Sequence, residues 1–384
     1  MRIILTGGGS GGHFYPMIAV AQQIHEIAKR DHLIEPELIY MATEAYDPDA
    51  LLENNIEFKH ITAGKQRRYA SFKNVLDVFK IGWGMVKAVV KVFISFPDVI
   101  FSKGGYPSVP VVFAARLFRI PLVIHESDSV PGRANAWAAT YAHRIAISYP
   151  DSAQYFESIT AKRKKKPGIA LTGNPIRHEL QSVASAGAHE FLKLEQSIPT
   201  ILVLGGSQGA QAINETLIEA LPQLVEKYQI LHQTGKELYD ITRGTSALIL
   251  EGNPLKERYH AFPFLNVVAM RMSAGAADLV ISRAGSGSIF EIAAWGKPSI
   301  LIPIPTLVSH DQEKNAFAYA RTGSAIVIEQ ANLTPNLLVS EIDRLISAPD
   351  EMTHMAQKAA AFARPDAAEK IAREVLDVAL EHEE

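Results

Sequence analysis

The sequence contains no cysteine in its 384 residues. This excludes disulfides, thiolate metal ligands and a cysteine nucleophile, and it fits a reducing compartment. Long apolar runs are also missing: none reaches the ~18 residues of a membrane span, and the first run is shorter than the roughly seven to fifteen residues of a secretory signal. The net charge of -3 gives no general attraction to nucleic acid. We expect a folded cytoplasmic protein without a nucleic-acid partner, which touches a membrane without crossing it.

The sequence does contain the same pattern twice. An apolar stretch at 2–6 runs into glycines at 7–12, and another at 200–204 runs into glycines at 205–209. Helical patterns alternate with further apolar runs at 38–41, 97–101, 121–124, 144–147, 230–232, 266–268, 279–281, 299–302 and 325–328. This alternation favours parallel sheets, and the length exceeds the roughly 250 to 300 residues of one core. We predict an α/β protein with two Rossmann-like domains whose parallel sheets face a central cleft.

The predicted domains are residues 1–175 and 176–365. A helical pattern follows Pro365, and we expect this helix, within 366–384, to pack back on the first domain.

The first glycine turn has a histidine directly behind it. Glycine turns that open a helix bind phosphate groups, because backbone approaches closely and free N–H groups point at the anion. His13 lies in the first turn of the expected helix, where its imidazole could take a proton from an attacking hydroxyl. A histidine that only packs against the turn is the alternative. The acid of a dinucleotide site and the lysine of an NTP-hydrolysing loop are not found at their usual spacing.

Polar clusters follow several of the other predicted strands, where open α/β sheets bind ligands. The clusters are 102–107, 125–128, 282–291 and 309–315. A carboxylate of the second cluster could orient His13, although Glu126 could equally anchor its own loop. Backbone N–H groups at 282–291 could cradle a diphosphate, with Glu291 near ribose hydroxyls, and the amides and carboxylates at 309–315 suit a sugar.

The segment 65–94 combines basic residues with an apolar stripe. Lys65, Arg67 and Arg68 precede a helical pattern in which lysines alternate with apolar residues at spacings of three and four. The apolar residues are Phe72, Val75, Leu76, Phe79, Trp83, Val86 and Val90. Such a helix suits an anionic membrane surface. A helix that packs this face on the sheet and leaves its lysines in water is the alternative.

The order of motifs resembles the MurG family, the N-acetylglucosaminyltransferases that turn lipid I into lipid II in peptidoglycan synthesis. The matching motifs are 8–13, 104–106, 125–126, 173–177, 205–210, 283–285, 291–294 and 311–315. The resemblance implies a GT-B fold, UDP-N-acetylglucosamine as donor and an undecaprenyl-linked N-acetylmuramyl-pentapeptide as acceptor. It also implies peripheral attachment to the cytoplasmic side of the cell membrane, with cell-wall synthesis proteins as further partners.

The resemblance also implies the site residues. Donor contacts fall on Ser10, Gly11, Gly12, Arg177, Ser207, Leu265, Ser286, Gly287, Ser288, Ile289, Phe290, Glu291 and Gln312. The acceptor side falls on Gly104, Gly105, Glu126 and Asn135, and the catalytic set on His13, Tyr106 and Asp128. Many members have Gln-Asn where this chain has Ser127-Asp128, so the acid at 128 could assist His13.

The implied reaction is a single displacement at the anomeric carbon. The C4 hydroxyl of the muramyl sugar attacks, a base removes its proton, and UDP leaves with inversion. Helix N-termini and Arg177 supply positive charge, so we expect no cofactor and no obligatory metal. Three alternatives are another GT-B transferase with a lipid acceptor such as diacylglycerol, a dinucleotide-dependent oxidoreductase, and a non-catalytic subunit that binds a sugar nucleotide or acts as a membrane scaffold.

Overall fold

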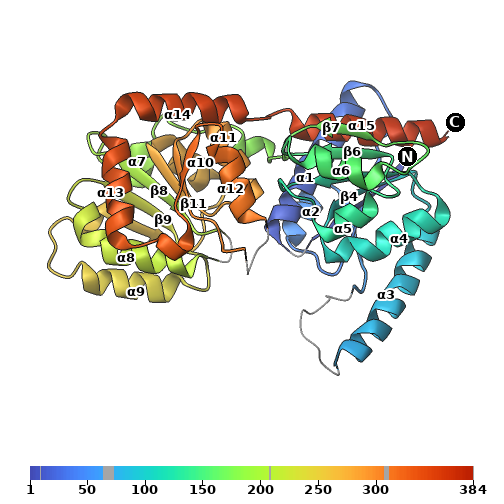
Figure 1. Cartoon of the computed structure of the whole chain (residues 1–384), viewed down its shortest axis with the longest axis horizontal. Coiled ribbons are helices and arrows are strands. Elements are labelled where there is room, and N and C mark those ends of the chain that lie inside the picture. Colours follow the sequence, from blue (N-terminus) through green and yellow to red (C-terminus); the bar gives the residue numbers. More distant parts are fainter. Residues whose placement is uncertain (9, 64–72, 207–208, 307–310, 384) are drawn as a thin grey trace. The chain divides into compact units, whose positions relative to one another are not determined.

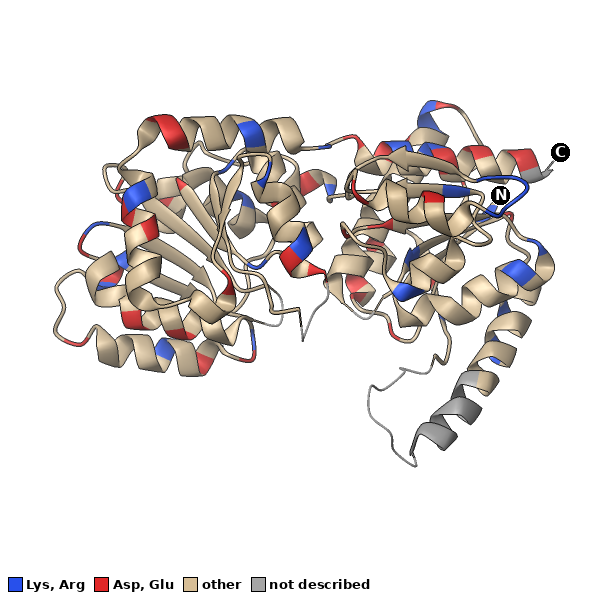
Figure 2. Cartoon of the chain, viewed as in Figure 1, with Lys and Arg blue, Asp and Glu red and all other residues tan. Residues whose placement is uncertain are grey.

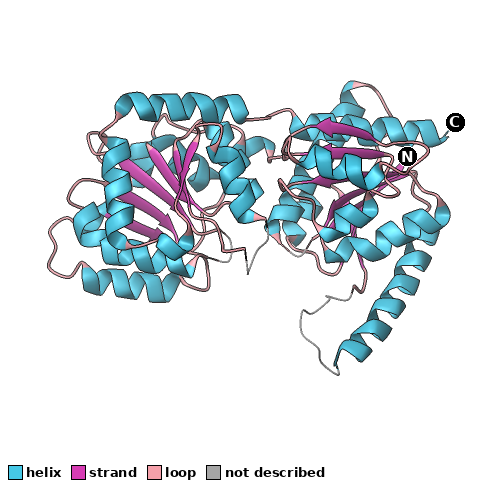
Figure 3. Ribbon diagram, viewed as in Figure 1, coloured by secondary structure: helices cyan, strands magenta, loops and turns pink. Residues whose placement is uncertain are grey.

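The computed structural model describes residues 1–8, 10–63, 73–206, 209–306 and 311–383. Their contacts divide the chain into two compact units (Figure 1). Unit 1 consists of Met1–Arg177 and Arg364–Glu384, and unit 2 of His178–Ala363. Each unit has one parallel sheet with helices packed on it (Figure 3). The predicted α/β fold with two Rossmann-like domains is therefore confirmed.

Unit 1 is built on seven parallel strands in the order β3-β2-β1-β4-β5-β6-β7. The strands are β1 (Arg2–Gly7), β2 (Glu37–Ala42), β3 (Ile56–His60), β4 (Val99–Gly104), β5 (Leu122–Glu126), β6 (Arg144–Ile147) and β7 (Gly168–Leu171). The helices are α1 (Gly11–Arg30), α2 (Pro48–Glu53), α3 (Lys73–Ser95), α4 (Val109–Phe118), α5 (Arg133–Ala138), α6 (Ser152–Thr160) and α15 (Ala367–Glu383), with a 3-10 turn η1 (Tyr106–Ser108). The order reverses between β1 and β4, where open sheets bind ligands outside the carboxyl ends of their strands.

Successive residues of β1 pack into different layers of unit 1. Ile3 and Leu5 lie in the cluster that contains the apolar faces of α1 and α15. Ile4, which points to the other face of the sheet, lies in the cluster with α3 and α4. This period of two explains why the strand is apolar throughout, since both faces of a parallel sheet are covered.

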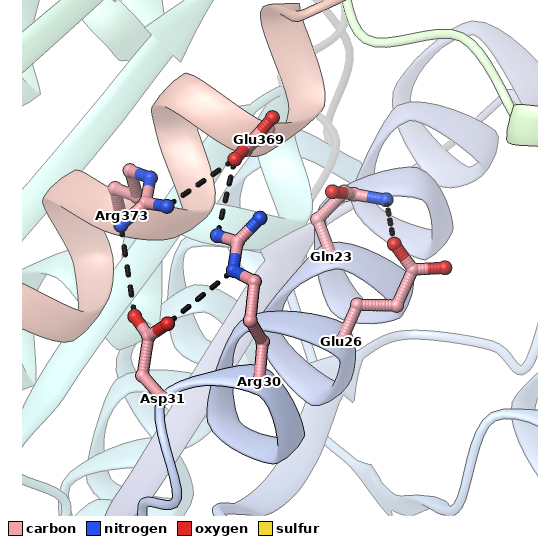
Figure 4. Close-up of polar contacts among 6 residues, drawn as sticks. All are labelled: Gln23, Glu26, Arg30, Asp31, Glu369 and Arg373. Carbon is pink, nitrogen blue, oxygen red and sulfur yellow. Dashed lines mark hydrogen bonds and ion pairs between the residues drawn. The ribbon is translucent and has the colours of Figure 1, made fainter.

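The last helix, α15, packs on α1. Its buried residues Ile371, Val375 and Leu376 belong to the same core cluster as β1 and α1. At the surface Arg30 reaches Glu369 at 3.2 Å, and Arg373 lies 3.7 Å from Asp31 (Figure 4). These ion pairs are exposed, and exposed pairs contribute little to stability. The apolar face therefore holds α15 in unit 1.

Unit 2 repeats the topology with six parallel strands in the order β10-β9-β8-β11-β12-β13. The strands are β8 (Thr200–Leu204), β9 (Gln229–Gln233), β10 (Tyr259–Phe262), β11 (Leu279–Ser282), β12 (Ser299–Leu301) and β13 (Ala325–Val327). The helices are α7 (Ala188–Leu192), α8 (Gln211–Leu224), α9 (Tyr239–Ile249), α10 (Val267–Ala276), α11 (Ser286–Trp295), α12 (Gln312–Ala320), α13 (Pro335–Ile346) and α14 (Pro349–Phe362), with 3-10 turns η2 (His178–Leu180), η3 (Lys256–Arg258) and η4 (Gln330–Asn332). Here the order reverses between β8 and β11.

One predicted strand is wrong and three strands were not predicted. The stretch 266–268 begins helix α10, because Oδ1 of Asn266 accepts the backbone N–H of Ala269 at 2.9 Å and caps the helix. The strands that the sequence did not indicate are β3, β7 and β10. All three are edge strands, and they lack the continuous apolar run of a central parallel strand.

The predicted helix in the segment 72–94 is present as α3. Its inward stripe consists of small residues, Gly84, Ala88 and Val92, while Trp83 is 60% exposed. Gly84 touches the chain after β3, where a methyl group would overlap the carbonyl oxygen of Thr62. No helix in the described ranges is long and apolar enough to cross a membrane.

We predict that Gly84→Ala destabilises unit 1 by about 1 to 3 kcal/mol, because the new methyl group must displace the backbone at Thr62. Gly82→Ala is the matched control on the same helix, since its new methyl group would meet nothing within 4 Å. The control should be neutral or stabilise by up to about 1 kcal/mol. Urea unfolding followed by circular dichroism measures both, and equal midpoints for the two variants would contradict the close approach.

Candidate active site

The loops after β1 and β4 approach each other more closely than side chains allow. Gly105 has a φ of +80°, and a Cβ there would lie 2.9 Å from the carbonyl oxygen of Gly8. Gly104 borders Asn135 in the same way, with its missing Cβ 2.7 Å from Oδ1 of the amide. The predicted acceptor-side residues Gly104, Gly105 and Asn135 are thus neighbours at the reversal of strand order.

Helix α1 begins at this place with its first N–H groups uncapped. Ser10 is the N-cap residue, but no described side chain caps the helix, and its first turn has no acid. Gly12 is exposed and Gly11 is half-buried. Free N–H groups at a helix start form a favourable environment for an anion. The predicted donor residues Ser10, Gly11 and Gly12 therefore have the geometry of a phosphate-binding turn.

His13 follows in the first turn of α1. Its Nδ1 is buried and has no hydrogen-bond partner among the described residues. Burial and the ammonium of Lys103 lower the pKa of His13, whereas the carboxylate of Asp128 and a hydrogen bond to the backbone of Lys103 raise it. The net shift is downward from 6.5, so the imidazole is neutral at neutral pH. A neutral imidazole can accept a proton.

Lys103 belongs to the predicted polar cluster 102–107, but the sequence analysis gave it no role of its own. It ends β4, its side chain is fully buried, and its Nζ donates to Oγ of Ser127 and, at 3.1 Å, to Oδ1 of Asn174. Burial lowers its pKa to about 8, while Glu126 and Asp128 raise it. A lysine that closes an apolar strand was visible in the sequence. Lysines, however, are almost never fully buried, so the residue type alone indicated a surface position.

Glu126 anchors the loop that follows β5. Its carboxylate accepts three hydrogen bonds of 3.0 Å, from the backbone N–H groups of Asp128 and Gly132 and from Nδ2 of Asn135. Burial and the carboxylate of Asp128 raise the pKa of Glu126 to about 7, whereas the three donors lower it. These contacts agree with the alternative prediction that Glu126 anchors its own loop. The half-buried Asp128 is held by this loop close enough to act on the pKa of His13.

Arg177 lies beside the start of α1. Its guanidinium stacks on the ring of Tyr15 at 4.2 Å, and Tyr15 donates its hydroxyl to Oδ2 of Asp47 at 3.2 Å. Burial and Asp47 raise the pKa of Tyr15 to about 12, while Arg177 lowers it. Tyr15 was not predicted as a site residue. Tyr106 lies in η1, directly after Gly105, and is half-buried.

Unit 2 presents a second uncapped helix start, at α11. Gly285 is the N-cap residue without a side-chain cap, and Gln312 lies beside it, with Nε2 4.0 Å from the missing Cβ. Oε1 of Gln312 accepts the backbone N–H of Ile304 at 3.2 Å. The predicted donor residues Ser286, Gly287, Ser288 and Glu291 belong to the first two turns of α11. The side chains of Ile289 and Phe290 are buried in the core, so these two residues can offer a ligand only backbone.

Leu265 is buried in unit 2, and its backbone N–H donates to Oε1 of Gln233 at 3.1 Å. That N–H is therefore already used, and the neighbouring Phe264 has the exposed ring, with Lys236 5.5 Å from its centre. Ser207 lies outside the described residues. Among the described residues no group of three or more His, Asp or Glu side chains could hold a metal ion.

Comparison with known proteins gives matches in both units. The family model "Glycosyltransferase family 28 N-terminal domain" matches residues 3–147, and "Glycosyltransferase family 28 C-terminal domain" matches residues 200–371. A Clostridium novyi protein is 36% identical over 90% of each chain, and a Listeria welshimeri protein is 33% identical over 98% of this chain and 99% of its own. Both are named UDP-N-acetylglucosamine--N-acetylmuramyl-(pentapeptide) pyrophosphoryl-undecaprenol N-acetylglucosamine transferase.

A solved structure agrees with these matches. The crystal structure of Acinetobacter baumannii MurG superposes with a TM-score of 0.71 at 26% identity, covering 98% of this chain and 99% of that one.

We predict that Asn135→Ala lowers the stability of unit 1 by about 1 to 3 kcal/mol, because the buried carboxylate of Glu126 loses one of its donors. Gln154→Ala, which truncates an exposed amide on α6, is the control and should change stability little. Urea unfolding of both variants provides the measurement. If the two substitutions lower the free energy of unfolding equally, Asn135 does not stabilise the loop after β5.

Proposed function

The chain belongs to the MurG family within glycosyltransferase family 28, and we propose that it transfers N-acetylglucosamine from UDP-N-acetylglucosamine to undecaprenyl-diphospho-N-acetylmuramyl-pentapeptide. The protein is thus a glycosyltransferase of peptidoglycan synthesis, and its product is lipid II. One observation carries this proposal: relatives with that name match over 90% or more of this chain, across both units.

Unit 2 supplies the donor contacts in this proposal. The uncapped start of α11 gives backbone N–H groups for the diphosphate, Glu291 accepts from ribose hydroxyls, and Gln312 is available for the hydroxyls of the sugar. In this proposal the backbone of Leu265 reads the base through its carbonyl, since its N–H is bonded to Gln233. The ring of Phe264 is 42% exposed beside it and suits stacking on uracil.

Unit 1 supplies the base. In the proposed reaction His13 removes the proton of the muramyl C4 hydroxyl as that oxygen attacks C1 of the donor sugar, and the UDP oxygen takes the electrons of the breaking bond. The configuration at C1 inverts. The depressed pKa of His13 supports this role, because the imidazole is already unprotonated when the acceptor arrives. Asp128 stabilises the imidazolium that forms.

We propose that the charge of the leaving diphosphate is balanced by the protein. The uncapped helix starts and the guanidinium of Arg177, which Tyr15 holds by stacking, provide positive potential. On this basis the reaction needs no cofactor and no obligatory divalent ion. Transfer that stops on addition of EDTA and returns with magnesium would contradict this part of the proposal.

We propose further that unit 1 attaches to an anionic membrane surface through an apolar patch on α3 and α4. The patch consists of Trp83, Val86, Val90, Phe93, Ile94, Phe96, Leu117 and Phe118, which are all exposed large apolar residues. Phe93 packs against Phe118 with ring centres 5.6 Å apart, so the two helices form one surface. Lys87, Lys91 and Arg116 lie on the same two helices (Figure 2).

The exposure of this patch favours the membrane interpretation of the segment 65–94. Small residues of α3 face the sheet, so the large apolar side chains are left outside. Basic residues next to exposed apolar rings suit anionic lipid headgroups. Lys65, Arg67, Arg68 and Phe72 of the predicted segment lie outside the described residues, as do the side chains of Val75, Leu76 and Phe79.

The activity test is transfer of labelled N-acetylglucosamine from its UDP donor to lipid I, with diacylglycerol as the competing acceptor. We expect product with lipid I alone. His13→Ala should lower kcat by about 100-fold or more and leave UDP affinity nearly unchanged, as removal of a general base does. His354→Ala, an exposed histidine on α14, is the control. Turnover of diacylglycerol alone would contradict the assignment of lipid I as the acceptor. Full activity of His13→Ala would contradict the assignment of His13 as the base.

The membrane test is co-sedimentation with vesicles that contain phosphatidylglycerol. Replacing Trp83 and Phe93 by Ser should weaken binding at least about tenfold, since two large apolar side chains no longer enter the interface. The control replaces Ile241 and Leu248, which are 69% and 72% exposed on α9 of unit 2, by Ser. Equal binding of the two double variants would mean that the patch on α3 and α4 does not contact lipid.

A further inference from the structure

Lys103 is the one lysine that is fully buried in the part of the chain that the structure describes. It ends β4, and its ammonium joins two other strand ends: Ser127 follows β5, and Asn174 follows β7. These partners are a hydroxyl and an amide, which satisfy hydrogen bonds and carry no charge. The positive charge of Lys103 therefore acts on its surroundings.

Hydrogen bonding alone does not account for this choice of residue. Burying an ammonium costs free energy that a neutral side chain of the same length would avoid. A neutral amide could also bond to Ser127 and Asn174. The property that only a cation adds at this position is its electrostatic effect on neighbouring titratable groups.

The proposed base, His13, is one of the titratable groups on which the charge of Lys103 acts. Its imidazole makes a hydrogen bond to the backbone of Lys103 and is exposed to the charges of Lys103 and Asp128, which act in opposite directions. The titratable groups that interact with His13 or Lys103 come from β4, β5 and the loop after β5: Lys103 and Asp128 act on His13, His125 on β5 interacts with His13, and Glu126 on β5 acts with Asp128 on Lys103. Lys103 is the cation whose charge lowers the pKa of the imidazole.

We propose that Lys103 is a positioning residue for the base: its buried ammonium, fixed by Ser127 and Asn174, repels a second positive charge on His13 and keeps the imidazole ready to accept a proton. The inference rests on the proposed role of His13 as base. It assigns a role to a residue whose side chain is fully buried, and it makes the working pH range of the enzyme depend on that side chain.

The protonation behaviour follows from the two charges. Like charge disfavours the imidazolium, so loss of the Lys103 charge raises the pKa of His13, and loss of the Asp128 charge lowers it. Burial lowers the pKa of Lys103 to about 8, so it is still mostly charged at neutral pH. The acidic limb of the pH profile of kcat/KM reports the pKa of a base in the free enzyme, so it should shift in the same direction as the pKa of His13.

The test is an NMR titration of the His13 imidazole in the full chain, with the signal assigned by loss in His13→Gln. We expect the midpoint to rise by about one pH unit in both Lys103→Met and Lys103→Gln. Lys103→Arg keeps the charge and should keep the midpoint. Asp128→Asn should shift it downward. The two neutral variants differ in hydrogen bonding, so misfolding of one leaves the other to decide.

Lys59→Met is the matched control, because it removes a half-buried lysine of the same sheet, on β3, whose Nζ lies 3.3 Å from Oγ of Ser95. The control should not move the midpoint. An unchanged midpoint in both neutral Lys103 variants, or an equal shift in Lys59→Met, would overturn the proposal.

The kinetic counterpart is the pH profile of kcat/KM for transfer to lipid I. The acidic limb should move to higher pH in Lys103→Met and Lys103→Gln, while a merely structural role would lower the whole profile without moving the limb. The titration needs no turnover, so absence of transferase activity would contradict the proposed function and leave the Lys103 result standing. A shift of the limb without a shift of the His13 midpoint would overturn the Lys103 proposal alone.

Discussion

The close approach of backbone after β1 and β4 is the constraint on which the site of unit 1 depends. A side chain at Gly105 would collide with the carbonyl of Gly8, and one at Gly104 would collide with Asn135. Because these atoms are in contact, α1 starts directly beside the ends of β4 and β5. His13 on α1, Lys103 on β4 and Asp128 after β5 then act on one another electrostatically, although they are far apart in the sequence.

A comparison of His232 with His13 shows what this arrangement adds. In unit 2, His232 is fully buried, and both its nitrogens have partners: Nε2 lies 3.0 Å from Oδ1 of Asn214, and Nδ1 lies 2.9 Å from the hydroxyl of Tyr259. Burial lowers the pKa of His232 to about 3, so it is a neutral and satisfied part of the core. His13 has an unpartnered Nδ1 and two charged neighbours instead. An unsatisfied nitrogen beside charges is typical of a functional site rather than of packing.

The sequence predicted the central strands and the glycine turns because both faces of a parallel sheet are covered and its strands read as apolar runs. The edge strands β3, β7 and β10 were not predicted, since partly exposed strands contain polar residues that interrupt the apolar run. The stretch 266–268 was wrongly predicted as a strand because its two valines favour one, whereas the side chain of Asn266 caps a helix that begins there. In the site, motif order pointed to His13 and Asp128. The role of Lys103 depends on burial and on Asn174, and neither can be read from spacing.

Helix α15 belongs to the core of unit 1 although it is the last element of the chain. Its residues Ile371, Val375 and Leu376 close the layer over β1 and α1, while all of unit 2 lies between them in the sequence. Domains usually fold in the order in which the ribosome releases them. Here the first unit to begin is completed after the second, because its apolar layer stays uncovered until α15 has been synthesised. A nascent chain of this protein therefore carries a complete second unit ahead of a complete first one.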